Sequence, residues 1–149
     1  MERETQKGEG MLVLTDTYPA ISSEDFLQFE EILGKKLPKS MMDFYLKHNG
    51  GQPLVMGVHD EHHLFPFNSF DSLEEMRKSL TWYDDEAVPA GFRATDLLHF
   101  AYDPGSGNYA LSLREEDYGM VYFYVLEETA ELYGQWPSFE VFLNSFVEE

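Results

Sequence analysis

Apolar side chains between residues 22 and 51 recur with the period of a helix. Ser22 and Asp25 have the spacing of a capping box, which opens a helix. The apolar positions that follow at i, i+3 and i+7 are Phe26, Phe29 and Leu33. A second run begins at Pro38 and ends at the Asn-Gly-Gly segment 49–51. The two runs predict a helical hairpin.

Short apolar runs separated by turn residues predict antiparallel strands along the rest of the chain. The expected strands are Met11–Leu14 at an edge, Val55–Val58, His63–Phe67, Leu97–Tyr102, Tyr109–Leu113 and Met120–Leu126. The capping box Ser72-x-x-Glu75 opens a helix within this series. A closing helix follows Pro137, and its apolar face is Phe139, Phe142, Leu143 and Phe146. We expect the rings of Phe142 and Phe146 to be buried.

This order of elements predicts an α+β fold in a single domain. A mainly antiparallel sheet carries an N-terminal helical hairpin, one inserted helix and a C-terminal helix. The polar residues 1–10 predict a flexible tail, so the domain covers residues 11–149. The start of the chain has no signal-peptide core, and no apolar run has the length of a membrane span. We therefore expect a cytoplasmic protein.

Charge limits the partners that this chain is expected to bind. Its 28 acidic and 10 basic residues give a formal net charge of −18 over 149 residues. Such a surface repels phosphate, so neither nucleic acid nor an anionic membrane is an expected partner. A basic protein is the natural complement, although the same charge also serves solubility.

Motifs for catalysis or cofactor binding are missing from the sequence. The chain has no cysteine, which excludes disulfides, thiolate nucleophiles and cysteine-ligated metals. It has neither a P-loop nor a dinucleotide-binding fingerprint. The Asp103–Asn108 loop lacks the ligand register of an EF-hand and is better interpreted as a β-turn. We expect a protein that is not an enzyme and uses no cofactor.

The segment His59–His63 is the one cluster whose side chains suit a transition metal. Its His-x-x-His-His spacing matches neither the HExxH pattern nor a facial triad of two His and one carboxylate. Adjacent imidazoles at His62 and His63 point to opposite faces if the segment is extended. We interpret the cluster as a polar turn between strands, with a metal site as the minor alternative.

Charge is also distributed unevenly along the chain. From Ala101 to the C-terminus there are ten acidic residues and one basic residue, Arg114. This asymmetry produces a directional field, and turns can present its source without disturbing a core. The candidate partner-binding residues are the acids of one loop and two hairpin turns: Asp84, Asp85, Glu86, Asp103, Glu115, Glu116 and Asp117. A solvated face without a partner is the alternative.

An ordered set of segments resembles the SUKH superfamily, which includes the fungal Smi/Knr regulators of cell-wall synthesis and many bacterial immunity proteins. The N-terminal signature is Leu33-Gly34, then Leu37-Pro38, an aromatic-rich helix and Asn49-Gly50-Gly51. Further matching segments, spread over residues 22–147, are 63–67, 100–103, 107–109, 121–123 and 139–143. The matched residues are helix punctuation and core positions, so they carry fold rather than function.

The resemblance implies a binding role without catalysis. For the bacterial branch it implies neutralisation of a toxin domain, often a nuclease, and such a partner is expected to be basic. For the fungal branch it implies a scaffold that regulates through protein contacts. The compact chain favours the bacterial immunity type, with the Smi/Knr type of regulator or scaffold as the alternative. The His59–His63 segment lies outside the family pattern and receives no role from it.

Overall fold

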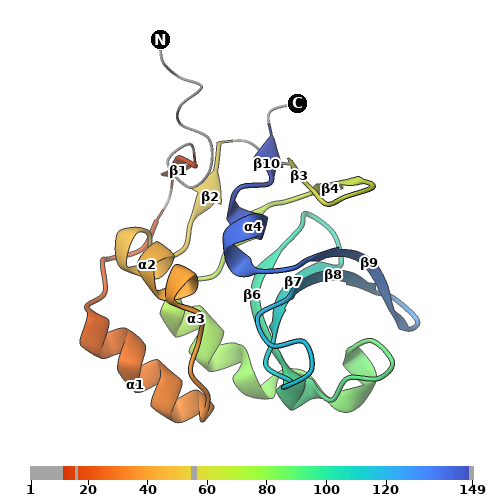
Figure 1. Ribbon diagram of the computed structural model, residues 1–149, viewed down its shortest axis with the longest axis horizontal. Coiled ribbons are helices and arrows are strands. Elements are labelled where there is room, and N and C mark those ends of the chain that lie inside the picture. The colour runs from red at the N-terminus through yellow and green to blue at the C-terminus, as the bar shows by residue number, and fades with distance from the viewer. Residues whose placement is uncertain (1–11, 16, 55–56, 148–149) are drawn as a thin grey trace.

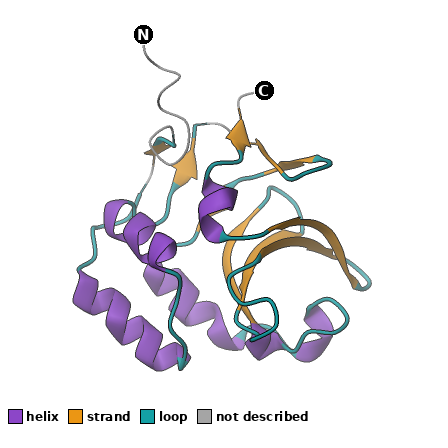
Figure 2. Cartoon of the chain, in the orientation of Figure 1, coloured by secondary structure: helices purple, strands orange, loops and turns teal. Residues whose placement is uncertain are grey.

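The first three helices gather on one side of the molecule and a curved antiparallel sheet lies on the other, with the last helix between them (Figures 1 and 2). The computed structural model describes residues 12–15, 17–54 and 57–147. The expected tail 1–10, and residues 55 and 56 of an expected strand, lie outside these ranges. The grouping of helices and antiparallel strands in one domain confirms the predicted α+β class.

The helical hairpin forms where its caps predict it. Helix α1 (Ser23–Leu33) begins at the reciprocal capping box of Ser22 and Asp25. It ends at Gly34, whose φ of 80° is the left-handed conformation that glycine adopts at least cost. Helix α2 (Lys39–Lys47) follows Pro38 and buries Met41, Phe44 and Tyr45. Met42 and Leu46 of the same helix are half-buried.

A third helix and three helical turns lead into the main sheet. Helix α3 (Leu73–Lys78) begins at the capping box of Ser72 and Glu75. It continues into the 3-10 turn η3 (Ser79–Thr81). Two further turns, η4 (Asp85–Ala87) and η5 (Ala94–Asp96), close the loop before the sheet.

The described strands form three antiparallel sheets. The five-stranded sheet has the order β5 (Ser69–Phe70), β6 (Leu97–Tyr102), β7 (Gly107–Ser112), β8 (Val121–Leu126) and β9 (Ala130–Trp136). The three-stranded sheet has the order β10 (Phe146–Val147), β3 (Gly57–His59) and β4 (Leu64–Pro66). The small sheet pairs β1 (Leu14–Thr15) with β2 (Gln52–Pro53).

Side chains on both faces of the five-stranded sheet are buried, which explains why β6 and β8 are almost continuously apolar. One face packs against α2, α4 and the small strands through an aromatic-rich core. The other face packs beneath the loop of η4 and η5, where Val88, Tyr122 and Tyr124 lie. The loop therefore covers this face of the sheet.

Two predictions for the C-terminal region are wrong. The closing helix α4 covers only Phe139–Leu143, because Ser145 N bonds to Phe142 O in a tightened last turn. Phe146 lies instead in β10, opposite Val58, and is half-buried. Its ring still reaches the core, 4.8 Å from that of Phe67. Strand β9 is absent from the predicted elements, since Ala130–Trp136 lacks a regular alternation of apolar and polar residues.

His99 is buried within the sheet as a neutral imidazole. Its Nε2 lies 2.6 Å from the Tyr124 hydroxyl, and its ring stacks on Tyr83 at a centroid distance of 3.7 Å. Burial lowers the pKa of His99 to about 3. The side chain therefore joins the covering loop to the sheet without carrying charge.

Truncation of Phe142 is expected to destabilise the fold strongly, because its ring is fully buried. We expect Phe142→Ala to lower the free energy of unfolding by about 3–5 kcal/mol and the half-buried Phe146→Ala by about 1–3 kcal/mol. Urea unfolding followed by fluorescence measures both. Equal costs would contradict the assignment of Phe146 to a half-buried strand.

Replacing His99 should remove part of the pH dependence of stability. The unfolded imidazole binds a proton below about pH 6.5, while the folded one stays neutral, so stability falls as pH drops from about 6.5 towards 3. His99→Phe should therefore cost about 2 kcal/mol less at pH 5 than at pH 8, measured by urea unfolding.

Asp71 acts in the opposite direction, since burial and then the nearby Glu75 raise the pKa of its carboxyl to about 7. Protonation of Asp71 therefore stabilises the fold as pH falls below 7. This contribution is present in the parent and in His99→Phe, so it cancels in the difference between their free energies of unfolding. A cost of His99→Phe that does not change with pH would contradict a buried, neutral imidazole.

Candidate functional site

The His-rich turn between β3 and β4 is fastened to the outer side of β9. Asp60 Oδ1 accepts hydrogen bonds from the backbone N–H groups of His62 and His63, both at 2.9 Å. Its Oδ2 accepts one from Gln135 N at 3.2 Å, and Trp136 Nε1 donates to His59 O at 3.0 Å. Partial burial acts to raise the pKa of Asp60, but the three backbone donors outweigh it and lower that pKa.

Packing beneath the turn depends on a glycine in β9, Gly134, which has no side chain. The ring of Phe65 in β4 lies against Gly134, where a Cβ atom would come within 2.6 Å of it. Phe65 also contacts the rings of Phe123 and Trp136, at centroid distances of 5.1 and 6.0 Å. Gly134 thus lets the β3–β4 hairpin approach the five-stranded sheet closely.

The imidazoles of the turn are exposed and do not form a ligand set. His59 Nδ1 lies 3.1 Å from Asp60 O, and His62 Nε2 lies 3.7 Å from Glu61 Oε1. Within the described ranges, no three His, Asp or Glu side chains converge as ligands of one metal ion. The hydrogen bonds of Asp60 instead show what its carboxylate does, which is to shape the turn.

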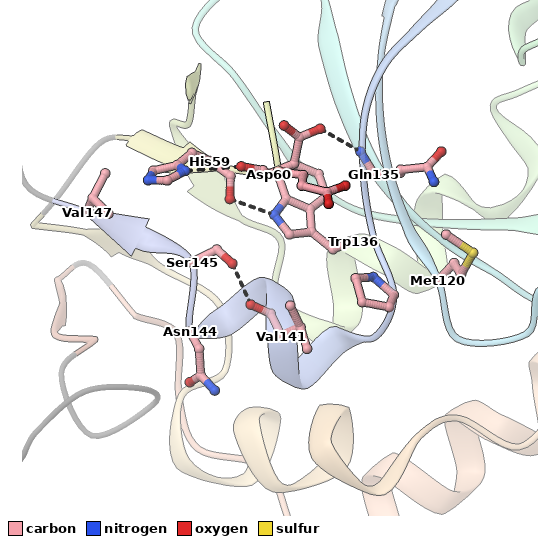
Figure 3. A pocket seen from close by; sticks show the side chains of 11 residues that line it. His59, Asp60, Met120, Gln135, Trp136, Val141, Asn144, Ser145 and Val147 are labelled. Carbon is pink, nitrogen blue, oxygen red and sulfur yellow. Dashed lines mark hydrogen bonds between the residues drawn. The ribbon is translucent and has the colours of Figure 1, made fainter. Parts of the chain in front are cut away.

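Two hollows flank the turn along the edge of β9. The larger, about 560 Å³, lies towards α4 and is lined by residues such as Met120, Trp136 and Val141. Figure 3 shows its side chains, with Asp60 bonded to Gln135 and His59 O to the indole of Trp136. The smaller, about 320 Å³, lies between the turn and the segment 132–135 of β9.

Apolar side chains are exposed around the smaller hollow. Leu132 and Tyr133 in β9 line it and are 43% and 56% exposed. Leu64 at the start of β4 follows the turn, outside the lining of the hollow, and is 51% exposed. The pairing of β8 with β9 shifts between Leu132 and Gly134, so Tyr133 is the extra residue of a β-bulge. Exposed apolar side chains next to a hollow are characteristic of a binding surface.

The electrostatic character of this surface is uniform. The segments 48–76 and 115–149, which supply both the hairpin and β9, contain no Lys or Arg. Acidic residues near the exposed apolar group are Asp60 and Glu61 in the turn, Glu131 in β9, and Glu127 and Glu128 before it. We call the surface formed by residues 59–64 and 127–135 the β9 face.

The predicted acidic residues do not share one face. In a meander, successive hairpin turns lie at opposite ends of the sheet. Asp103 is in the β6–β7 turn, beside the turn before β9, as the bond from Leu126 N to Ser106 O shows. Glu115, Glu116 and Asp117 lie in the β7–β8 turn at the other end.

The loop Asp84–Glu86 belongs with the β7–β8 turn rather than with Asp103. Asp85 accepts a hydrogen bond from Ala94 N at 2.8 Å, which ties η4 to η5. Arg114 in turn donates from Nη1 to Gly91 O at 3.0 Å, next to η5.

Basic side chains surround the acids of the β7–β8 turn. Glu115 and Glu116 line a hollow that also contains Lys35, Arg93 and Arg114. The negative field of this turn is therefore partly offset, in contrast to that of the β9 face.

Four of the seven predicted residues serve their own loops. Asp84 accepts from Glu86 N at 3.1 Å and caps η4, and Asp103 accepts from Gly105 N and Gly107 N at 2.8 Å. Asp85 bonds to η5 as described, and Asp117 lies within a network. Glu86, Glu115 and Glu116 are exposed.

Asp117 is a structural carboxylate. It accepts hydrogen bonds from Ser112 Oγ and the Tyr122 hydroxyl at 2.6 Å and forms a salt bridge with Arg114 Nη2 at 2.6 Å. Arg114 also lies over the Phe92 ring, 3.9 Å from its centroid. Burial acts to raise the pKa of Asp117, but these donors lower it to about 2.

The predicted partner-binding residues are all acidic and do not include Leu64, Leu132 or Tyr133. The signal for these three residues was the stretch without Lys or Arg, combined with apolar residues outside a regular pattern. That signal indicates a binding surface only once β9 is seen to be an edge strand with the His-rich turn folded onto it.

Comparison with known proteins identifies a family. A family model described as the SMI1 / KNR4 family (SUKH-1) matches residues 20–145. A search of curated proteins found no match. Within the described residues, none of the helices combines the length and the hydropathy needed to cross a bilayer.

Removing the Asp117 carboxylate should destabilise the protein, because Arg114 and two hydroxyl groups would lose their partner. We expect Asp117→Ala to lower the free energy of unfolding at pH 7 by about 2–4 kcal/mol, measured in urea. Glu116→Ala, whose side chain is 71% exposed, should change it by less than about 0.5 kcal/mol.

The pH dependence of the free energy of unfolding provides a second test of the role of Asp117. A carboxyl whose pKa is lowered stabilises the fold above its ordinary pKa of 3.8, and this contribution is lost as pH falls from about 4 towards 2. The difference between Asp117→Ala and the parent should shrink over that range. An unchanged difference would contradict a carboxylate stabilised in its charged form.

Proposed function

Since the chain belongs to the SMI1 / KNR4 family (SUKH-1), we propose that it is a non-catalytic binding protein of the immunity type that neutralises a basic protein toxin. A nuclease is the favoured class of toxin domain, because such enzymes carry the basic surfaces that bind nucleic acid. Neutralisation would take place in the cytoplasm. A Smi/Knr-type regulator that acts through protein contacts is the alternative within the same family.

The observation that carries the proposal is the β9 face. It combines exposed Leu132 and Tyr133 with acidic neighbours in segments that contain no Lys or Arg. Protein interfaces commonly place apolar and tyrosine anchors at the centre and charged groups at the rim. A basic partner meets both requirements on this face, since its cations pair with the carboxylates while its apolar side chains cover the anchors.

Electrostatics also predicts the kinetics of binding. A net charge of −18 attracts a basic toxin from a distance, so association is fast at low salt. Screening at about 0.5 M salt should slow association much more than it speeds dissociation.

The deciding experiment begins with the open reading frame next to this gene. Its C-terminal domain is expressed with and without this protein, and growth rescue and complex formation are measured. Rescue with a stable one-to-one complex supports the immunity function. Recovery of several unrelated partners from lysate, with no rescue, supports a scaffold instead.

Two double variants with the same charge change locate the surface. Glu61→Lys with Glu131→Lys alters the β9 face, and Glu115→Lys with Glu116→Lys alters the β7–β8 turn. We expect the first pair to lower the association rate about tenfold or more and the second to have a smaller effect. All four side chains are exposed, so folding stability should change little.

The outcomes of this comparison are distinct. A larger effect of the second pair would assign binding to the predicted acidic turns. Equal rates for both variants and the parent would contradict an acidic binding surface, even with the toxin still neutralised.

A further inference from the structure

Strand β9 forms an outer edge of the five-stranded sheet. In the described part of the chain it pairs with β8 alone. The His-rich turn meets its outer side at Gln135 through Asp60 Oδ2. The first half of the strand, Ala130–Tyr133, lies beyond that contact. An edge of this kind presents backbone N–H and C=O groups that a further strand can pair with.

This edge lacks the usual protection against pairing. Proteins commonly shield an edge strand with lysine, with proline within the strand, or by making it very short. Strand β9 has seven residues, none of them Lys or Pro. Its open half instead exposes Leu132 and Tyr133, which line the smaller hollow together with residues 60–63 of the turn. The bulge at Tyr133 and the charge of Glu131 are the shielding features of this half of β9, and a partner with Lys or Arg turns that charge into an attraction.

We propose that the open half of β9 binds an extended, basic segment of a partner protein as an added strand. This inference rests on the proposed function, because it describes how that partner is held. Backbone hydrogen bonds to Ala130–Tyr133 supply part of the affinity, and side chains supply the specificity. Alternate side chains of the added strand cover Leu132 and Tyr133, while its Lys or Arg residues pair with Glu131 and with Glu61 in the turn.

Charge selects this occupant over a second copy of the chain. Pairing two β9 strands would bring two Glu131 side chains, and two molecules of net charge −18, together. A basic segment removes this repulsion and satisfies the carboxylates. The hairpin supports the same choice, since the turn at the end of the open half carries Glu61 next to the fixed Asp60.

A synthetic peptide tests the mode of binding directly. The probe is a capped octapeptide of alternating Lys and Val, added to the isotope-labelled full chain at low salt. We expect amide chemical-shift changes centred on Ala130–Tyr133. Hydrogen exchange of outward-facing amides in this segment should slow at least about fivefold, because they gain acceptors. An alternating Glu and Val octapeptide should produce neither effect.

Backbone methylation separates strand addition from simple charge attraction. A Lys-Val octapeptide N-methylated at alternate residues along one edge keeps its charges but loses donors along that edge. We test both edges and expect at least one methylated peptide to bind about ten times more weakly than the parent. If both bind as well as the parent, the face attracts basic chains through side chains alone. That result overturns strand addition and leaves the proposed function standing.

A matched pair of protein variants localises the effect. Tyr133→Lys places a lysine on the open edge, and Ile32→Lys makes the same kind of change on α1, where the side chain is 59% exposed. We expect Tyr133→Lys to weaken binding of the peptide and of the toxin domain about tenfold or more, and Ile32→Lys less than about twofold. Equal effects would overturn the assignment to β9.

Toxin rescue is measured separately for both variants. Failure of the parent protein to neutralise the toxin would contradict the proposed function, whereas slowed exchange confined to Ala130–Tyr133 on peptide binding would still support strand addition. Neutralisation by the parent with protection elsewhere would overturn strand addition alone.

Discussion

Packing around the Phe142 ring joins the parts of this structure. The ring is fully buried and lies within 5.0–5.6 Å of the rings of Phe100, Tyr109, Trp136 and Phe146, measured between centroids. These partners come from β6, β7, β9 and β10, so one side chain of the short helix α4 contacts both larger sheets. Edge-to-face and tilted contacts of this kind add specificity to the burial of apolar area. A helix of five residues has little stability of its own, and α4 depends on these contacts.

The position of the β9 face follows from this core. Trp136 is fixed by Phe142 and Phe65, and its indole N–H then fixes the His-rich turn through His59 O. The turn covers the second half of β9 and leaves the first half open. Core packing therefore determines which part of the edge strand a partner can reach.

The basic residues are concentrated in the helical part of the molecule. Six basic residues lie on or beside the helices α1–α3 (Figure 1), namely Lys35, Lys36, Lys39, Lys47, Arg77 and Lys78. The β3–β4 hairpin and β9 contain no Lys or Arg. The acidic turn predicted as a partner surface, Glu115–Asp117, lies next to basic residues and uses Asp117 internally. The net charge alone thus indicates that a partner is positively charged. The positions of the basic residues decide on which surface the negative field remains uncompensated.

The sequence by itself determined the features that depend on neighbours along the chain. Capping boxes at Ser22 and Ser72, and Gly34 after α1, specify helix boundaries through backbone hydrogen bonds within a few residues. Apolar runs in β6 and β8 and the order of elements indicated the α+β class, and the ordered motifs were sufficient to indicate the family.

Only the tertiary structure decided the features that depend on distant neighbours. Phe146 has helical spacing from Phe142 and Leu143, but pairing with Val58 makes it part of a strand. Strand β9 has weak local signals and exists because β8 pairs with it and Phe65 packs on Gly134. Exposure of Leu132 and Tyr133 depends on where the His-rich turn stops, which Asp60 sets through a hydrogen bond spanning 75 residues. Such contacts form between groups that the sequence separates, so local patterns specify the elements while packing decides which of their edges and faces stay open.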